Sequence, residues 1–238
     1  MLTNSCLFSI PVEMDKKLIF NLDGIRATLQ IINLSYKRLC QSLEYLSLQN
    51  NNMDFTHVSL DGWAFIDSLD RLRGLWNNLD NILDFKKEYS KLNVEKRLLE
   101  VRNIRNVISH LPQRIDSLIA KNSSAMGEIG WIFLVDKELP SAKTYYIRYG
   151  TFYKNVSFKL TLPQTDLTFN QNNIGLIEFK VGEYVTELTK LYDFVNELHS
   201  ELERTLLPKF SAFKKSSVCP PNIFGSAELN TTNWITSS

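Results

Sequence analysis

The spacing of apolar residues constrains the fold more than any other feature, because they recur every three or four positions through most of the first 120 residues. This spacing puts apolar side chains on one face of an α-helix, and such faces must pack against one another. In the helix expected from about residue 56, the second of the chain, Asp61-Gly62 leaves open whether the first turn is separate from the rest. Pro112 lacks an amide hydrogen and disfavours helix at the residue before it, so the third helix should end or kink just after His110. We expect helices from about 23 to the polar run at 49–52, and over about 56–87, 92 to 110 or 111, 114–121 and 183–206.

Between residues 128 and 181 the spacing changes to that of strands. Four segments, 128–135, 143–152, 156–162 and 174–181, are rich in aromatic and β-branched residues, and Pro, Asn, Asp and Gly separate them. They predict a small antiparallel sheet or meander of three or four strands. The helices on either side of it need each other to bury their apolar faces.

The predicted fold class is therefore mainly α, with a small antiparallel β insertion (α+β). We expect a single domain over residues 1–210, built as a four-helix bundle with the β insertion at about 128–181. The segment 211–238 is rich in Ser, Thr, Asn and Pro and is expected to be an irregular tail.

Charge and cysteine content limit the functional classes. The chain has 27 basic and 26 acidic residues, so no overall charge attracts it to nucleic acid or membranes, and any RNA site must be a local patch. Cys6, Cys40 and Cys219 lack metal-ligand or disulfide-motif spacing and suggest free thiols in a reducing compartment. The N-terminus does not resemble a signal peptide, and no apolar run could span a bilayer. We expect a soluble cytoplasmic protein that does not contact membranes.

Several common catalytic motifs are absent from the sequence. It contains no glycine-rich phosphate loop, no HExxH, no paired-cysteine metal site and no GxSxG elbow. These absences argue against nucleotide-driven enzymes, zinc proteases and serine hydrolases. We therefore predict neither a metal site nor a cofactor.

The segment EVRNIRNVISHLP, residues 100–112, carries the residues best suited to chemistry. On a helix, Arg102, Asn106 and His110 are spaced by four and form one stripe, whereas Arg105 lies about 140° from His110 around the axis. The apolar residues of this helix supply a full buried face, which leaves the polar stripe free for a site or a dimer contact.

Arginine, amide and imidazole groups together can bind a phosphate, orient it and move a proton. Guanidinium suits a phosphate that gains charge in the transition state, and imidazole exchanges protons near neutral pH. These groups suffice for metal-independent RNA cleavage, in which the ribose 2′-hydroxyl attacks the adjacent phosphate.

The run Arg105-Asn106-x-x-x-His110 resembles the signature of the HEPN superfamily, an arginine followed by a polar residue and then a histidine, on a helix of an all-α bundle. The resemblance covers about residues 20–120 plus the last helix. The β insertion is not part of the minimal family fold. Family members with a tyrosine soon after the histidine are not matched, since Leu111-Pro112-Gln113 follow here.

The resemblance implies a HEPN-like helical bundle that forms a homodimer, with the two motifs meeting at the dimer seam. Many members are metal-independent endoribonucleases of prokaryotic toxin–antitoxin, abortive-infection or CRISPR-linked defence systems. By position, Arg105 would bind the scissile phosphate, Asn106 would orient the site and His110 would transfer protons. Arg102 lies outside the family motif, but it shares the helix stripe of Asn106 and His110 and is our candidate for a further RNA-binding residue. The expected partners are RNA, a second copy of the chain and an antitoxin or defence-system protein.

Other interpretations stay open. Some family members have lost the chemistry, so the chain could be a non-catalytic RNA-binding or protein-interaction module. Arg102 and Arg105 could form a solvated helix face, with His110 as a helix C-cap residue. His57 is expected to act in local capping, and His199 to lie at the surface or in an interface.

A cluster of aromatic and basic residues in the predicted strands has two interpretations. It could stack on bases and hold backbone phosphates, or it could be ordinary strand composition, which is the simpler explanation. Its members are Lys143, Tyr145, Tyr146, Arg148, Tyr149, Phe152, Tyr153 and Lys154.

Overall fold

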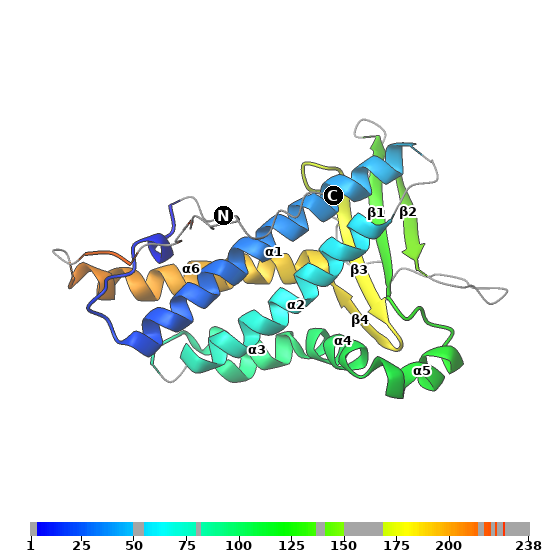
Figure 1. The fold of residues 1–238 in the computed structure, drawn as a ribbon. Coiled ribbons are helices and arrows are strands. Elements are labelled where there is room, and N and C mark those ends of the chain that lie inside the picture. Colours follow the sequence, from blue (N-terminus) through cyan, green and yellow to red (C-terminus); the bar gives the residue numbers. More distant parts are fainter. Residues whose placement is uncertain are drawn as a thin grey trace, which may run out of the picture.

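Three long helices run side by side, and a small sheet lies at one end of them (Figure 1). The computed structural model describes residues 4–49, 55–79, 82–136, 141–149, 169–213 and 217–219, with residues 222 and 226. The long helices are α1 (Lys16–Gln49), α2 (Thr56–Leu79) and α6 (Leu188–Ser211). The shorter ones are α3 (Lys91–Arg97), α4 (Leu99–Ser109) and α5 (Leu111–Ala120), with 3-10 turns η1 (Cys6–Phe8) and η2 (Lys87–Tyr89).

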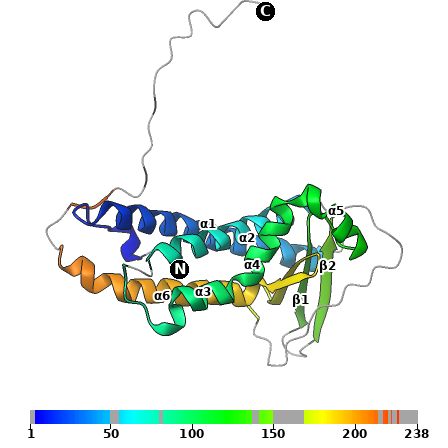
Figure 2. The same ribbon diagram turned by 90° about the horizontal axis from the view of Figure 1, so that it is seen from below.

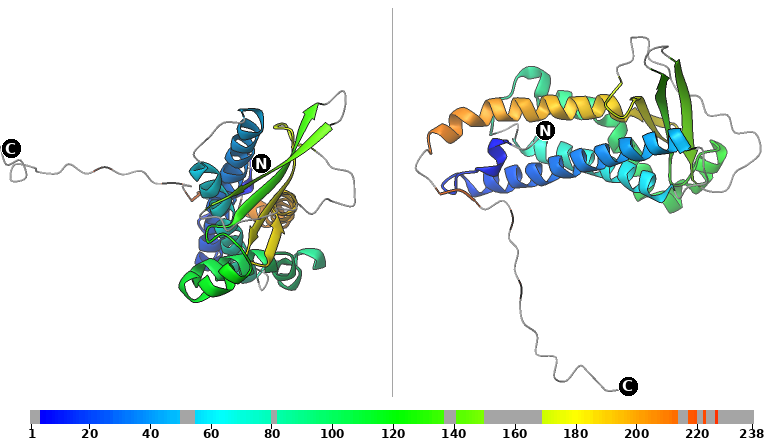
Figure 3. Two further views of the ribbon diagram at one scale, coloured as in Figure 1. Left: turned by 90° about the vertical axis from the view of Figure 1, so that its right-hand side faces the viewer. Right: turned by 90° about the horizontal axis from the view of Figure 1, so that it is seen from above.

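The sheet is antiparallel throughout, with strand order β2-β1-β3-β4 in the described residues. Its strands are β1 (Glu128–Asp136), β2 (Ser141–Arg148), β3 (Ile174–Val181) and β4 (Tyr184–Glu187). Trp131 of the central strand β1 pairs with Tyr145 on one side and Ile177 on the other. The end-on view shows the sheet standing beside the long helices, and β3 packs against α6 (Figure 3). The mainly α fold with a small antiparallel sheet is therefore confirmed.

One cluster of buried apolar side chains joins the helices to the sheet. Trp76 and Phe65 enter it from α2, Phe179 from β3 and Phe194 from α6, each at most 1% exposed. Gly62 lies where α2 meets the sheet, since a methyl group there would be 3.0 Å from Ile129 Cδ1 and 3.1 Å from Phe179 Cε2. The helix and strand patterns thus share one core, as expected if the faces must cover one another.

The first helix begins earlier than the apolar spacing predicts. The Oδ1 atom of Asp15 accepts hydrogen bonds from the backbone N–H groups of Lys17 and Leu18, both at 3.0 Å. This cap satisfies amides that a helix start leaves without partners, so α1 begins at Lys16 rather than near Asp23. Gly62 lies inside α2, and the first turn of that helix is not separate.

The predicted end of the second helix, near residue 87, is wrong, because α2 ends at Leu79. The following chain folds back onto α2. The indole N–H of Trp76 donates to the carbonyl of Tyr89 at 2.8 Å, and its ring stacks on Phe85 with centroids 4.5 Å apart. Residues 85 and 89 reach Trp76 because the chain leaves the helix after Leu79 and turns back along it.

Three further helices differ from the prediction. The helix expected over 114–121 is α5, which starts at Leu111. The third helix is divided at Leu98 into α3 and α4, although the Leu98 N–H still bonds to the Val94 carbonyl at 3.0 Å. The last helix starts at Leu188 rather than near 183, because Gly182, with φ of +62°, turns the chain so that β4 pairs with β3. The predicted strand at 156–162 lies outside the described residues.

Part of the expected tail also has structure. Pro208 lies inside α6, which continues to Ser211. An isolated bridge then joins Val218 to Pro11, and the Cys219 N–H donates to the Ile10 carbonyl at 2.9 Å. Most of 211–238 lies outside the described residues.

Candidate functional site

The helix that carries the motif, α4, ends just before Pro112, as predicted. The backbone of His110 leaves helical values, with φ of −117° and ψ of 32°, and its N–H bonds to the Asn106 carbonyl at 3.2 Å. Pro112 then occupies the first turn of α5, where its missing N–H leaves no bond unmade. His110 is therefore both the C-cap of α4 and the first residue of the junction to α5, which lies beside the sheet (Figure 2).

The inner face of α4 is apolar and the outer face is polar, as expected from the sequence. Val101, Ile104 and Val107 are buried, whereas Asn106 and His110 are exposed. Among the described residues, neither of these two side chains makes a hydrogen bond or ion pair. An exposed amide and an exposed imidazole are thus free to meet a ligand.

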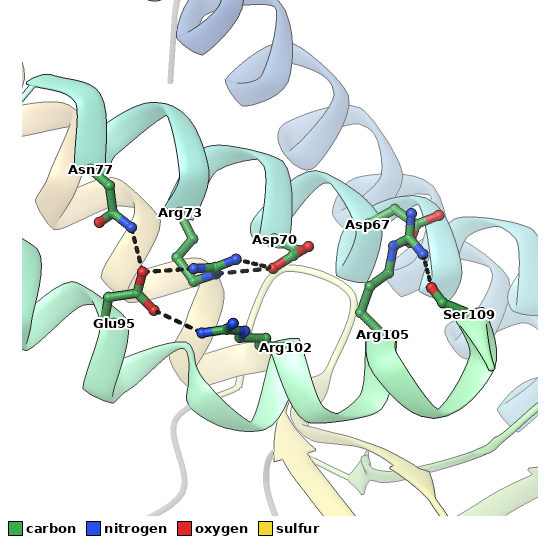
Figure 4. A network of polar contacts seen from close by, with 8 residues as sticks. All are labelled: Asp67, Asp70, Arg73, Asn77, Glu95, Arg102, Arg105 and Ser109. Atoms are coloured by element: carbon green, nitrogen blue, oxygen red, sulfur yellow. Dashed lines mark hydrogen bonds and ion pairs between the residues drawn. The ribbon is translucent and has the colours of Figure 1, made fainter. Parts of the chain in front are cut away.

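Arg105 already has partners within the chain (Figure 4). Its Nε atom lies 2.6 Å from Oδ1 of Asp67 on α2, and its Nη1 donates to the Ser109 hydroxyl at 2.5 Å. The two side chains of the ion pair are 41% and 45% exposed, so water can compete and the pair adds little stability. Arg105 is held in a defined direction yet stays accessible.

Arg102 lies at the end of a second polar network on the same surface (Figure 4). Its Nη1 atom is 4.0 Å from Glu95 Oε2, while the other oxygen of Glu95 binds Arg73 at 2.6 Å and accepts from Asn77. Burial opposes ionisation of Glu95, but the bonds from Asn77 and Arg73 outweigh it and lower its pKa. Arg102 is 52% exposed and only weakly held, so it could reach an external anion.

The three motif residues and Arg102 form an accessible surface rather than a closed site in one chain. In the described part of the protein, no polar contact joins Arg105 to His110. The structure therefore brings Arg105 together with Asp67 and Ser109, and leaves Asn106 and His110 open to solvent. A phosphate held between arginine and histidine would need one of these side chains to move, or a second copy of the motif.

The prediction for His199 is wrong, because this side chain is buried, with 9% exposure. Its Nε2 atom lies 3.2 Å from both the Ser5 hydroxyl and Glu203 Oε1. Both groups approach the same ring nitrogen, so Glu203 does not orient the imidazole from the opposite nitrogen as a catalytic triad requires. Glu203 also accepts from the Cys6 N–H at 3.0 Å, and the cluster ties η1 to α6.

Of the cluster of aromatic and basic residues in the strands, Tyr145 and Arg148 pack inward, whereas Tyr146 is 49% exposed. Tyr145 stacks on Trp131 with ring centroids 5.4 Å apart, and its hydroxyl donates to the Ser47 carbonyl at 3.2 Å. Arg148 is buried beside Glu128. For Tyr145 and Arg148 these contacts support ordinary strand composition, while Phe152, Tyr153 and Lys154 lie outside the described residues.

Sequence reasoning missed a cavity between α1 and α2, to which His57 contributes. Arg38 and Asp61 both line it and form an ion pair, with Arg38 Nε 3.3 Å from Asp61 Oδ2. The spacing of four between His57 and Asp61 was the available signal, but it does not show which part of α1 lies opposite.

No protein-family model, curated protein or solved structure matches this chain. Among the described residues, no group of three or more histidine, cysteine or acidic side chains could hold a metal ion. In the same ranges, no helix combines the length and apolarity needed to cross a lipid bilayer.

Proposed function

We propose that this chain is a HEPN-like, metal-independent endoribonuclease of a prokaryotic toxin or defence system, acting in the cytoplasm as a homodimer. The observation that carries the proposal is the place of the Arg-Asn-x3-His motif on the polar face of α4, where Asn106 and His110 are exposed and the Arg105 side chain is 41% exposed. The apolar face of α4 already packs against the rest of the chain, so packing does not explain why Asn106 and His110 occupy the opposite, polar face. Exposed imidazole, amide and guanidinium groups are those that phosphate binding and proton transfer require.

In the proposed mechanism the groups have separate tasks. His110 exchanges a proton with the ribose 2′-hydroxyl or the leaving 5′-oxygen, and Arg105 neutralises charge on the phosphate. Asn106 orients the phosphate, and Arg102 binds the RNA backbone. Asp67 aligns Arg105 in the free protein and must share it when RNA binds, because one guanidinium has five N–H donors.

A two-fold dimer supplies what one chain lacks. If the α4 surfaces of two copies face each other, the histidine of one copy can lie near the arginine of the other. The active species should then have about twice the mass of the chain by light scattering. Undiminished cleavage by a strict monomer would contradict the composite site.

The Arg105–Asp67 ion pair favours a second candidate function. An arginine neutralised within its own chain fits a non-catalytic module that binds RNA or protein through this surface. The two candidates differ in turnover, because the first cleaves RNA, whereas the second binds RNA or protein and cleaves neither.

The deciding experiment incubates purified protein with mixed RNAs in the presence of EDTA. We expect products with 2′,3′-cyclic phosphate and 5′-hydroxyl ends, and resistance of DNA and of 2′-O-methylated RNA. Cleavage of single-stranded DNA, or a requirement for added magnesium, would show that the proposed mechanism is wrong. RNA binding without cleavage would favour the non-catalytic module.

Matched variants separate chemistry from folding. His110→Ala should abolish cleavage, while Gln113→Ala, an exposed neighbour on α5, should retain it. Arg105→Lys should be severely impaired because lysine lacks the bidentate fork, whereas Arg71→Lys, an exposed arginine on α2, should behave as the wild type. All four should keep the wild-type circular dichroism spectrum.

A further inference from the structure

The cavity between α1 and α2 has a volume of about 330 Å³, at the lower end of the range for small-molecule sites. Its α1 wall carries residues separated by three or four positions, so they share one helix face. The α2 wall repeats this over the first turn and a half of that helix. The lining comprises Arg38, Gln41, Ser42, Tyr45, Leu46, His57, Val58 and Asp61.

One oxygen of a buried carboxylate in this lining receives no hydrogen bond from the described residues. The side chain of Asp61 is 4% exposed, and its Oδ2 atom receives no hydrogen bond from the described residues. Arg38 Nε lies 3.3 Å from that oxygen, but Arg38 itself is 45% exposed and can move. Burial raises the pKa of Asp61, and the charges of Arg38 and His57 act in the opposite direction. Because an incompletely bonded buried carboxylate is unfavourable, a ligand that brings N–H donors would gain from meeting it.

The remaining lining selects among such ligands. Tyr45 is 45% exposed and offers a ring on which a planar group can stack. Arg38 and His57 are exposed whereas Asp61 is buried, so the outer lining would repel a cationic guanidinium ligand and attract a phosphate. The ligand should therefore be a planar ring with adjacent N–H donors, joined to an anion.

Guanine nucleotides meet all of these conditions. The guanine edge presents a ring N–H beside an amino group, and one carboxylate can accept from both. Adenine presents one donor beside an acceptor, which an ionised carboxylate cannot satisfy. We propose that the cavity between α1 and α2 binds a guanine nucleotide, with Asp61 accepting from the base, Tyr45 stacking on it, and Arg38 and His57 holding the phosphate.

The proposal is tested by titrating the full chain with free GMP, AMP and IMP in a calorimeter. It does not rest on the ribonuclease proposal, because binding of free nucleotides needs no cleavage. We expect GMP to bind roughly tenfold or more tightly than AMP, and IMP, which lacks the amino group, to be weaker than GMP. Equal binding of AMP and GMP, or no binding of GMP at millimolar concentration, would overturn the proposal.

Exchanging the acceptor pattern gives a sharper test. Asp61→Asn should weaken GMP by roughly tenfold or more and should favour XMP, whose second ring carbonyl can accept from the new amide. Arg38→Gln, at an exposed position, should weaken GMP but not free guanosine. Asp70→Asn, the same substitution on the same helix but outside the cavity, should change neither. A folded Asp61→Asn protein with unchanged GMP affinity would refute the role of the carboxylate.

Discussion

Two glycines of α2 allow the packing of this helix against the sheet to be measured. Gly62 faces the sheet, where a methyl group would lie 3.0 Å from Ile129 Cδ1 and 3.1 Å from Phe179 Cε2. The Phe179 ring has little freedom to move away, because it is 1% exposed and Trp63 packs edge-on against it at 4.9 Å. A methyl group on Gly74 would have no atom within 4 Å.

Both glycine-to-alanine changes gain about 1 kcal/mol from helix propensity, so that contribution cancels between them. At Gly62 the added methyl group also overpacks the core, which costs about 1–3 kcal/mol. Gly74→Ala should therefore raise the free energy of unfolding by up to about 1 kcal/mol. Gly62→Ala should lie about 1–3 kcal/mol below Gly74→Ala.

Urea denaturation followed by circular dichroism measures both free energies in one experiment. Thermal melting should show the same order, with about 2–4 °C for each kcal/mol in a chain of this size. If Gly62→Ala proves as stable as Gly74→Ala, the conclusion that α2 packs closely against β1 and β3 at Gly62 is refuted.

Three further predictions concern charged groups. Burial lowers the pKa of His199 from its ordinary 6.5, so the free energy of unfolding should fall as the pH drops below about that value. His199→Gln should flatten this part of the plot of unfolding free energy against pH, measured by urea denaturation. An unchanged slope would show that His199 does not cause the pH dependence. Burial opposes ionisation of Glu95, but hydrogen bonds from two α2 side chains lower its pKa from 4.5. The stability that ionised Glu95 contributes should therefore be lost as the pH falls through the lowered pKa. Glu95→Gln should remove this loss of stability at acidic pH. Asp67→Asn should change the free energy of unfolding by less than about 1 kcal/mol, because its ion pair with Arg105 is exposed. The same variant should bind RNA more tightly in a filter-binding assay, because Asp67 no longer competes for Arg105. Weaker RNA binding would contradict this competition.

The sequence by itself determined the elements whose signals are local. The apolar spacing predicts α1 and α6, and the alternating aromatic segments predict β1 and β3, because a residue's neighbours three, four or two positions away lie on the same face. The same reasoning predicts that α4 buries Val101, Ile104 and Val107 and exposes Asn106 and His110. Pro112 correctly predicts the end of that helix.

Tertiary packing decided everything that depends on a distant partner. Trp76 draws the chain after Leu79 back onto α2, although the local pattern is compatible with a longer helix. His199 lies among polar helix residues in sequence, but a segment 194 residues away covers it. The Arg105–Asp67 pair and the cavity at Asp61 likewise arise only where two helices meet. Periodicity specifies which face a side chain occupies, whereas its charge environment depends on which face of another element packs against it.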